Sequence, residues 1–348
     1  MLAHPIKNCF YLSSMSLQKR QPSASEYTEG ILRGDRVLLS RAITLIESKR
    51  PEHQSLAQTI IEKCLPHTGS SIRIGITGSP GVGKSTFIEA FGTYIISEEN
   101  RKPAVLAIDP SSQMSKGSIL GDKTRMEKLS ANPNAFIRPS PAGSSLGGVA
   151  AKTREAMLLC EAAGYDTILI ETVGVGQSEI AVHSMVDFFL LLLLPGAGDE
   201  LQGIKRGIVE MADLIAINKA DGDRVDLAKS ARKDYAMALH LFPPKESNWI
   251  AKAITCSAVE QKGMTDIWAH IKSFQSLTQE NGWFENNRQQ QIKKWFHELL
   301  EQGLKQLFFK NERVSGSIKR IEQDVVSHKK TPVNAANFLL QFFEKNNL

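Results

Sequence analysis

A glycine-rich stretch between an apolar run and a helical pattern constrains this chain more than any other feature. Residues 72–77 are mostly apolar, the next eight residues read Gly-Ser-Pro-Gly-Val-Gly-Lys-Ser, and a helical pattern begins at Thr86. Glycines let backbone amides wrap a phosphate chain, and a helix N-terminus favours anions. The spacing predicts a strand, a nucleotide-binding loop and a helix, although a glycine-rich turn with a solvated lysine has the same letters.

Each position of this loop has a predicted role. Lys84 reaches the outer phosphates and Ser85 coordinates Mg²⁺. The predicted nucleotide contacts are Gly78, Ser79, Gly81, Val82, Gly83, Lys84, Ser85 and Thr86.

Length and composition exclude several classes of protein. The 348 residues suffice for one large α/β domain with smaller additions, and a net charge of +5 is too mild to indicate nucleic-acid binding. The four cysteines are far apart in sequence and the eight histidines are dispersed, so no disulfide framework or metal site is indicated. The longest apolar run, residues 188–194, falls far short of the ~20 residues that cross a membrane, and it predicts a buried strand.

The first thirty residues match no pattern that predicts a fold. They contain Lys7, Lys19 and Arg20 but no acidic residue before Glu26, which loosely resembles a transit peptide. A frayed N-terminus is the other interpretation. We therefore expect residues 1–30 to be disordered or unassigned and the protein to be cytoplasmic, with the mitochondrial matrix as the alternative.

Hydrophobic periodicity predicts the organisation of the rest of the chain. Apolar residues over 31–65 follow a helical spacing and predict a helical hairpin. Short apolar runs then alternate with helical stretches, which predicts an α/β fold with a doubly wound, mostly parallel sheet covered on both faces. Expected strands are 104–109, 135–138, 167–171, 187–194, 213–218 and 251–256; expected helices are 123–130, 146–163, 201–211, 226–239 and 264–277.

Strand character ends near residue 281, and three helical blocks follow at 292–308, 318–326 and 335–343. We expect N-terminal helices over 31–68, a nucleotide-binding domain over 69–280, and a helical extension over 281–348 that forms a dimer interface.

In doubly wound sheets, ligands bind at the carboxyl ends of the strands, so acids at those ends are candidate site residues. Glu171 ends an expected strand and Gly174 follows, a pattern that places an acid near Mg²⁺ and a flexible amide near the outer phosphate. Asp109 ends another strand and Asp122 follows it. Either Asp could bind Mg²⁺, position the attacking water, or serve only as a helix N-cap.

The tetrapeptide Asn218-Lys219-Ala220-Asp221, also at a strand end, indicates the base of the nucleotide. A carboxylate there accepts two hydrogen bonds from guanine, whereas adenine offers neither donor. Ser257 and Ala258 follow the last expected strand, where a backbone amide would meet guanine O6. The pattern predicts GTP and GDP as ligands, with Asn218, Lys219, Asp221, Ser257 and Ala258 at the base.

A glycine-rich, charged segment at residues 196–207 lies between these motifs. It suggests an element that couples the nucleotide site to a partner, and an ordinary strand-to-helix loop capped by Asp199 is the alternative.

Several of these strings together resemble one family. GSPGVGKST (78–86), DPSS (109–112), GSILGDKTRM (117–126), GYDTILIETVGVGQSE (164–179), GAGDELQGIKRGIVE (196–210) and NKAD (218–221) look like the methylmalonyl-CoA mutase-associated GTPases of the MeaB, ArgK or MMAA type. The similarity runs from about residue 31 to the end of the chain.

The resemblance implies a homodimeric chaperone that uses GTP and Mg²⁺ to gate adenosylcobalamin delivery to an acyl-CoA mutase and to protect that enzyme. A cobalamin adenosyltransferase is a second implied partner. The resemblance places Lys84, Ser85, Asp109, Asp122 and Glu171 around the nucleotide and metal. It also makes Asp199, Gln202 and Lys205 a switch towards the mutase.

The expected chemistry is attack of water on the γ-phosphate, with Lys84 offsetting the developing charge. Val175 stands where Ras-like enzymes have a glutamine that orients water, so hydrolysis should be slow without the partner. Three alternatives remain open: a P-loop ATPase or kinase acting in transport or small-molecule phosphorylation, a nickel-insertion GTPase, and a scaffold in which the loop is a relic.

Overall fold

The computed structural model describes residues 20–108, 126–139, 146–172, 178–196 and 206–347. The chain divides into two compact units: Met1–Gly69 with Glu155–Gly164, and Ser70–Arg154 with Tyr165–Leu348. The C-terminal helices belong to the same unit as the sheet.

The first unit is built from three short helices, α1 (Ala24–Leu32), α2 (Arg36–Glu47) and α3 (Pro51–Cys64), followed by the 3₁₀ turn η1 (Leu65–His67). Ser23 and Glu26 form a reciprocal capping box at α1, and Asp35 caps α2 by accepting from the Val37 and Leu38 amides. Helix α1 begins within the stretch for which the sequence predicted no element. The sequence analysis did not predict this helix, because it is short and is marked by its N-terminal capping residues rather than by a long helical pattern of apolar residues.

The core of this unit consists of apolar side chains facing inward from the three helices. Gly30 allows α1 and α2 to approach closely, because a Cβ at that position would come within 2.1 Å of Leu38 Cδ1. Fully buried members include Tyr27, Ile31, Leu39, Ile43 and Ile60.

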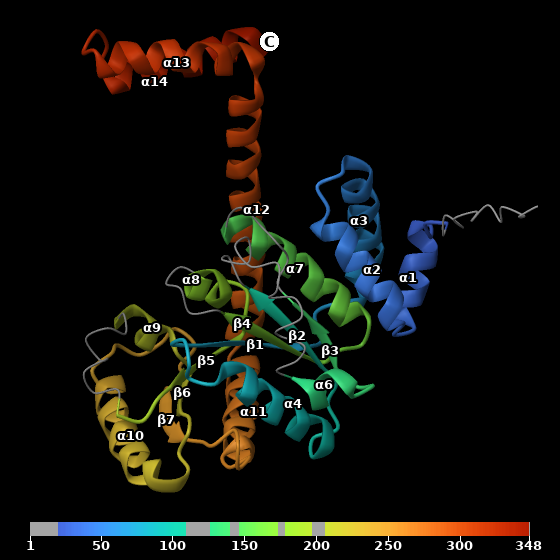
Figure 1. Cartoon of the computed structure of the whole chain (residues 1–348), viewed down its shortest axis with the longest axis vertical. Coiled ribbons are helices and arrows are strands. Elements are labelled where there is room, and N and C mark those ends of the chain that lie inside the picture. The colour runs from blue at the N-terminus through green and yellow to red at the C-terminus, as the bar shows by residue number, and fades with distance from the viewer. Residues whose placement is uncertain (1–19, 109–125, 140–145, 173–177, 197–205, 348) are drawn as a thin grey trace, which may run out of the picture. The chain divides into compact units, whose positions relative to one another are not determined.

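The second unit contains a seven-stranded sheet in the order β3-β2-β4-β1-β5-β6-β7, with every pairing parallel. This confirms the predicted α/β class with a doubly wound parallel sheet (Figure 1). The strands are β1 (Ile72–Gly78), β2 (Pro103–Ile108), β3 (Phe136–Arg138), β4 (Thr167–Thr172), β5 (Phe188–Leu193), β6 (Leu214–Ile217) and β7 (Lys252–Thr255).

The helices of this unit include α4 (Lys84–Ser97), α6 (Glu127–Ala131), α7 (Leu146–Ala162), α8 (Ser178–His183), α9 (Arg206–Met211), α10 (Val225–Leu239) and α11 (Met264–Glu280). Helix α7 contributes its second half to the first unit. The 3₁₀ turn η3 (Gly222–Arg224) precedes α10. Helix α8 was not predicted from the sequence, because six residues are too few to show a helical period.

Alternate residues of the central strands pack on opposite faces of the sheet. Leu190 and Leu192 of β5 join a core formed with α4 and α11, whereas Leu191 and Leu193 join a core formed with α9 and α10. Burial on both faces explains why β5 is a continuous apolar run rather than an alternating one.

The chain ends in the helices α12 (Trp283–Lys310), α13 (Glu312–Val326) and α14 (Pro332–Asn347). Each begins earlier than the apolar blocks predicted: α12 follows Gly282, α13 is capped by the Asn311 side chain, and α14 starts at Pro332. Helices α13 and α14 lie side by side, and Phe343 contacts Phe308 of α12 at a centroid separation of 5.3 Å (Figure 1).

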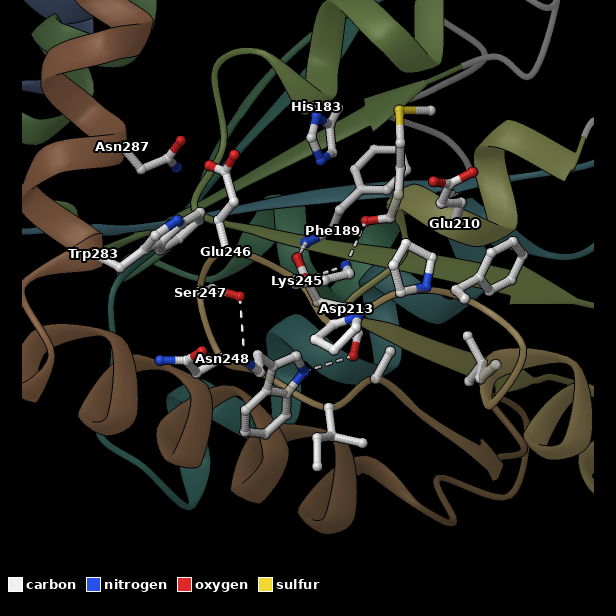
Figure 2. Close-up of a pocket in the computed structure, with 18 of the residues that line it drawn as sticks. His183, Phe189, Glu210, Asp213, Lys245, Glu246, Ser247, Asn248, Trp283 and Asn287 are labelled. Carbon is white, nitrogen blue, oxygen red and sulfur yellow. Dashed lines mark hydrogen bonds and ion pairs between the residues drawn. The ribbon is translucent and has the colours of Figure 1, made fainter.

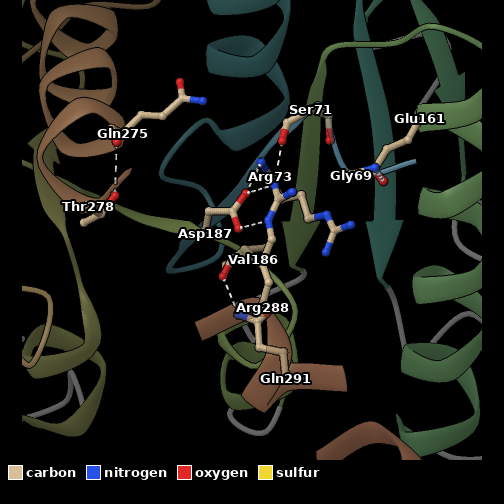
Figure 3. A network of polar contacts seen from close by, with 10 residues as sticks. All are labelled: Gly69, Ser71, Arg73, Glu161, Val186, Asp187, Gln275, Thr278, Arg288 and Gln291. Carbon is tan, nitrogen blue, oxygen red and sulfur yellow. Dashed lines mark hydrogen bonds and ion pairs between the residues drawn. The ribbon is translucent and has the colours of Figure 1, made fainter. Parts of the chain in front are cut away.

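A buried ion pair fixes the start of α12 to the sheet (Figure 3). Arg288 donates from Nε and Nη2 to the two carboxylate oxygens of Asp187, at 2.8 and 2.7 Å, and from Nη2 to the carbonyl of Ser71 at 2.5 Å. Asp187 also accepts from the backbone N–H of Arg73 at 2.8 Å. One side chain of α12 thus bridges the amino ends of β1 and β5.

Among the described residues, no helix has the length and apolar character needed to span a bilayer.

Candidate functional site

The glycine loop joins the carboxyl end of β1 to the N-terminus of α4, as the sequence predicted. Gly78, Gly81 and Gly83 have φ values of 154°, 82° and 92°. A Cβ at Gly78 would lie 2.4 Å from the Leu192 carbonyl oxygen, and one at Gly83 would lie 3.1 Å from Asn218 Nδ2. Both positions therefore require glycine for close backbone approach as well as for conformation.

Lys84 lies across the loop and is buried. Its ammonium donates to the carbonyl oxygens of Gly78 and Ser79, at 2.8 and 3.2 Å. Desolvation lowers the Lys84 pKa, while the nearby carboxylates of Glu171 and Glu179 act to raise it. Carbonyls are neutral acceptors, so a charged phosphate oxygen would be a stronger partner for this ammonium.

Ser85 and Glu171 come together although they are far apart in sequence. The Ser85 hydroxyl, in the first turn of α4, donates to Glu171 Oε1 at 3.2 Å, and Glu171 is buried near the end of β4. A hydroxyl and a carboxylate oxygen at this separation are hard oxygen ligands, which suit Mg²⁺. These two residues therefore fit the metal that the sequence predicted, whereas Thr86 in the same turn is exposed.

The end of β6 supports the loop from the other side. Asn218 Nδ2 donates to the Val82 carbonyl at 2.9 Å, and Lys219 Nζ donates to the Gly81 carbonyl at 2.8 Å. Lys219 takes a left-handed backbone conformation with φ of 58°. In this structure the two side chains thus hold the phosphate-binding loop in shape, a role that the tetrapeptide alone did not reveal.

Asp221 and the segment after β7 form the region predicted to contact the base. Ser257 Oγ donates to Asp221 Oδ2 at 2.5 Å, which orients the carboxylate. The Ala258 N–H donates to Asn218 Oδ1 at 3.2 Å, so the amide expected at guanine O6 already has a protein partner. At 3.2 Å this hydrogen bond lies at the long end of the ordinary N–H···O range.

Three features of the site had not been predicted. Glu179 is a buried carboxylate in the first turn of α8 whose charge acts to raise the pKa of Lys84; it ends the sequence motif at residues 164–179, which predicted no role for it. Thr172 donates to the Thr77 hydroxyl at 2.8 Å and ties β4 to β1 beside the loop. The Cys256 thiol contacts Asn218 Oδ1 at 3.7 Å, and burial raises its pKa to about 12.

The remaining predicted site residues lie outside the described part of the chain. They are Asp109, Asp122, Gly174, Asp199, Gln202 and Lys205. Among the described residues, no group of three or more His, Cys, Asp or Glu side chains could hold a metal ion.

Comparison with known protein families shows which family the chain belongs to. Residues 39–313 match the family described as methylmalonyl-CoA mutase-associated GTPase MeaB. The chain belongs to the MeaB family. The match covers the first unit from α2 onward, the whole sheet and helix α12.

Individual relatives agree with this assignment. The chain is 46% identical to GTPase ArgK of Escherichia coli, covering 84% of this chain and 88% of that protein. It is 44% identical to the mouse methylmalonic aciduria type A homolog, mitochondrial, covering 94% and 81%. A solved structure described as a LAO/AO transport system kinase has 38% identity and a TM-score of 0.75, covering 92% of this chain and 97% of that one.

This MeaB-family protein is therefore a GTPase that binds guanine nucleotide, as the glycine loop and the Asn-Lys-Ala-Asp motif predicted.

Proposed function

We propose that this chain is a GTP-hydrolysing chaperone for an adenosylcobalamin-dependent acyl-CoA mutase of the methylmalonyl-CoA mutase type. It gates loading of the mutase cofactor and protects the enzyme. The observation that carries the proposal is the family match over residues 39–313, since that family is described by its association with methylmalonyl-CoA mutase.

Lys84 and Ser85 have distinct tasks in the proposed reaction. Lys84 leaves the Gly78 and Ser79 carbonyls and donates to the β- and γ-phosphate oxygens of GTP. Ser85 and Glu171 would hold Mg²⁺, and a bound Mg²⁺ would neutralise negative charge on the phosphates. Asp109 and Asp122 stay candidates for the same metal shell or for positioning water.

The bond changes are those of hydrolysis. A water oxygen attacks the γ-phosphorus, the bond from phosphorus to the β,γ-bridging oxygen breaks, and GDP and inorganic phosphate leave. Val175 offers no hydrogen bond to the attacking water, so we propose that turnover is slow until the mutase binds.

The proposed switch towards the mutase consists of Asp199, Gln202 and Lys205. In the sequence these residues lie between β5, which pairs with β1, and α9. A cobalamin adenosyltransferase is a further proposed partner. We propose the cytoplasm as the compartment and the mitochondrial matrix as the alternative, since the mouse relative is named as mitochondrial.

The C-terminal helices support a homodimer. Five apolar side chains three or four residues apart on α12 are each between 47% and 64% exposed: Ile292, Phe296, Leu300, Leu304 and Leu307. An exposed apolar stripe of this length favours a helical partner surface. Leu304→Glu should convert a dimer to a monomer in light scattering, and a wild-type monomer would refute the dimer proposal.

A kinase acting on ATP is the alternative suggested by the description of the solved relative. Adenine would leave Asp221 without its two donors, so the base site favours the GTPase proposal.

The direct test is capture of a purified adenosylcobalamin-dependent acyl-CoA mutase by this chain, with a non-hydrolysable GTP analogue or with GDP. We expect the amount of captured mutase to depend on the nucleotide and to fall in Lys205→Ala. The exposed Lys233→Ala on α10 is the matched control and should behave as wild type. Equal absence of mutase in both nucleotide states would exclude the chaperone function while leaving the GTPase assignment intact.

A further inference from the structure

A large cavity lies at the end of the sheet opposite the nucleotide loop. Its volume is about 970 Å³, within the range of small-molecule sites. It opens where β5, β6 and β7 begin, and its walls come from α8, α9, the 240–251 segment and the start of α12 (Figure 2). The nucleotide loop follows the carboxyl end of β1, so the two sites lie at opposite edges of one parallel sheet.

The polar groups at the floor of the cavity are hydrogen-bonded, and their charges cancel. Lys245 donates to the carbonyl oxygens of Met211 and Ala212 and to Asp213 Oδ1, at 3.0, 2.8 and 2.6 Å. Asp213 Oδ2 accepts from the backbone N–H of Phe189 at 2.8 Å, and its carbonyl accepts from Trp249 Nε1 at 2.9 Å. All three ammonium hydrogens of the lining lysine are therefore already used.

The acidic side chains of the lining fall into two groups. Asp187 is neutralised by Arg288, and Asp213 by Lys245. Glu210 and Glu246 are exposed, and neither makes an ion pair with any described residue. The cavity thus presents two uncompensated carboxylates, which lie on either side of the His183 ring in the view of Figure 2.

His183 adds an acceptor to this wall. Its ring packs edge-on against Phe189 at 5.4 Å and is open to the cavity. Desolvation by the surrounding protein is the main cause that lowers the His183 pKa; Asp213 acts against it, and Lys245 and Lys294 act with it. A neutral imidazole can accept a hydrogen bond from a cationic N–H donor.

Aromatic rings complete the lining. Phe189, Phe242, Trp249 and Trp283 all contribute, and the Trp249 and Trp283 rings are held edge-on by Phe274 at 5.5 and 6.0 Å. Aromatic faces attract organic cations, and they also bury the apolar stem that carries the charge.

We propose that this cavity is a second ligand site, which binds a small organic cation: a primary ammonium or guanidinium group on an apolar stem. The charged group is attracted by the carboxylates of Glu210 and Glu246, and the stem packs on the aromatic wall. An anion such as a phosphate is disfavoured because the only lining lysine is committed to Asp213. A bare divalent ion is disfavoured because no described group of three suitable side chains could hold it.

To test this, phenethylammonium is titrated into the full chain saturated with GDP. Its neutral analogue 2-phenylethanol is titrated in parallel. We expect the cation to bind about tenfold more tightly than the alcohol. Raising the salt concentration from about 50 to about 500 mM should weaken the binding of the cation but not that of the alcohol, because salt screens exposed carboxylates. Equal affinities, or no binding of the cation up to about 10 mM, a weak limit for a site of this kind, would overturn the proposal.

Variants then locate the site. Glu210→Gln and Glu246→Gln should each lower the affinity for the cation about three- to tenfold and leave the affinity for the alcohol unchanged. Glu98→Gln, an exposed glutamate at the end of α4, is the matched control and should have no effect. GDP affinity serves as the readout of folding and should stay constant in all three. Competition between GDP and the cation, or unchanged cation binding in both cavity variants, would contradict the assignment.

Discussion

The ion pair between Arg288 and Asp187 should be among the most important single contacts in the sheet-containing unit. Arg288 is 6% exposed and Asp187 is 3% exposed, and the two are joined by a two-pronged hydrogen bond. Arg288→Met keeps much of the side-chain volume, but it leaves the buried Asp187 carboxylate without a cationic partner, although the Arg73 N–H still donates to it. Breaking one half of a buried pair in this way costs about 3–5 kcal/mol.

Urea unfolding followed by tryptophan fluorescence is the appropriate assay. All four tryptophans, Trp249, Trp268, Trp283 and Trp295, belong to the second unit, so the signal reports that unit alone. We expect Arg288→Met to lower its free energy of unfolding by about 3–5 kcal/mol. Adding Asp187→Asn should recover part of the loss, because it removes the uncompensated charge.

The exposed Arg320→Ala on α13 is the control and should change the free energy by no more than about 0.5 kcal/mol. If Arg288→Met cost less than about 1 kcal/mol, or if the double variant were less stable than the single one, the uncompensated charge would not be the cause.

Three further predictions concern individual side chains. Asp221→Asn should weaken GTP binding about a hundredfold and shift preference towards xanthine nucleotides, measured by competition, and retained GTP selectivity would refute the base assignment. Because burial raises the pKa of Cys256 to about 12, only about one thiol in ten thousand should be ionised at pH 8. A thiol reagent should therefore label Cys256 only after unfolding, and labelling of Cys256 in the native protein within minutes, located by peptide mapping, would contradict this. Desolvation lowers the pKa of His183 in the folded protein below its ordinary value of 6.5. Its contribution to stability is therefore fully present above pH 6.5 and is lost as the pH falls through the folded pKa. His183→Gln should make the urea midpoint less dependent on pH, and an unchanged pH dependence would contradict this shift.

Much of the sheet could be predicted because the strands are buried on both faces. Continuous apolar runs located the six strands after β1 to within one residue at each end. The ends differ because Asp187 and Asn218 continue the backbone ladder by one bond beyond the assigned strands. Short elements were missed: α1 depends on the Ser23 cap, and α8 has six residues.

The nucleotide loop could be predicted because its chemistry is local: glycines, a lysine and a serine at fixed spacing. The contacts that shape it could not, since they join residues more than eighty positions apart. Ser85 meets Glu171, and Asn218 meets Val82, only because parallel strands bring their carboxyl ends to one edge. The sequence predicted that these residues lie in the site. It did not predict that the side chains of Asn218 and Lys219 contact the phosphate-binding loop.

The cavity at the opposite edge had no sequence signal at all. Its walls come from four separate segments of the chain, and none of the side chains forms a motif. The net charge of the cavity depends on which acidic side chains are paired with a basic one. Only the three-dimensional structure shows that Lys245 pairs with Asp213 and Arg288 with Asp187.

The most direct test of the proposed function is the rate of GTP hydrolysis by this chain with and without a purified adenosylcobalamin-dependent acyl-CoA mutase. With Val175 in place of an orienting glutamine, we predict slow turnover alone and an acceleration of at least about tenfold when the mutase is present. Lys84→Ala should abolish both rates, which shows that the activity belongs to this chain. Equal rates with and without the mutase would contradict the claim that the partner controls hydrolysis.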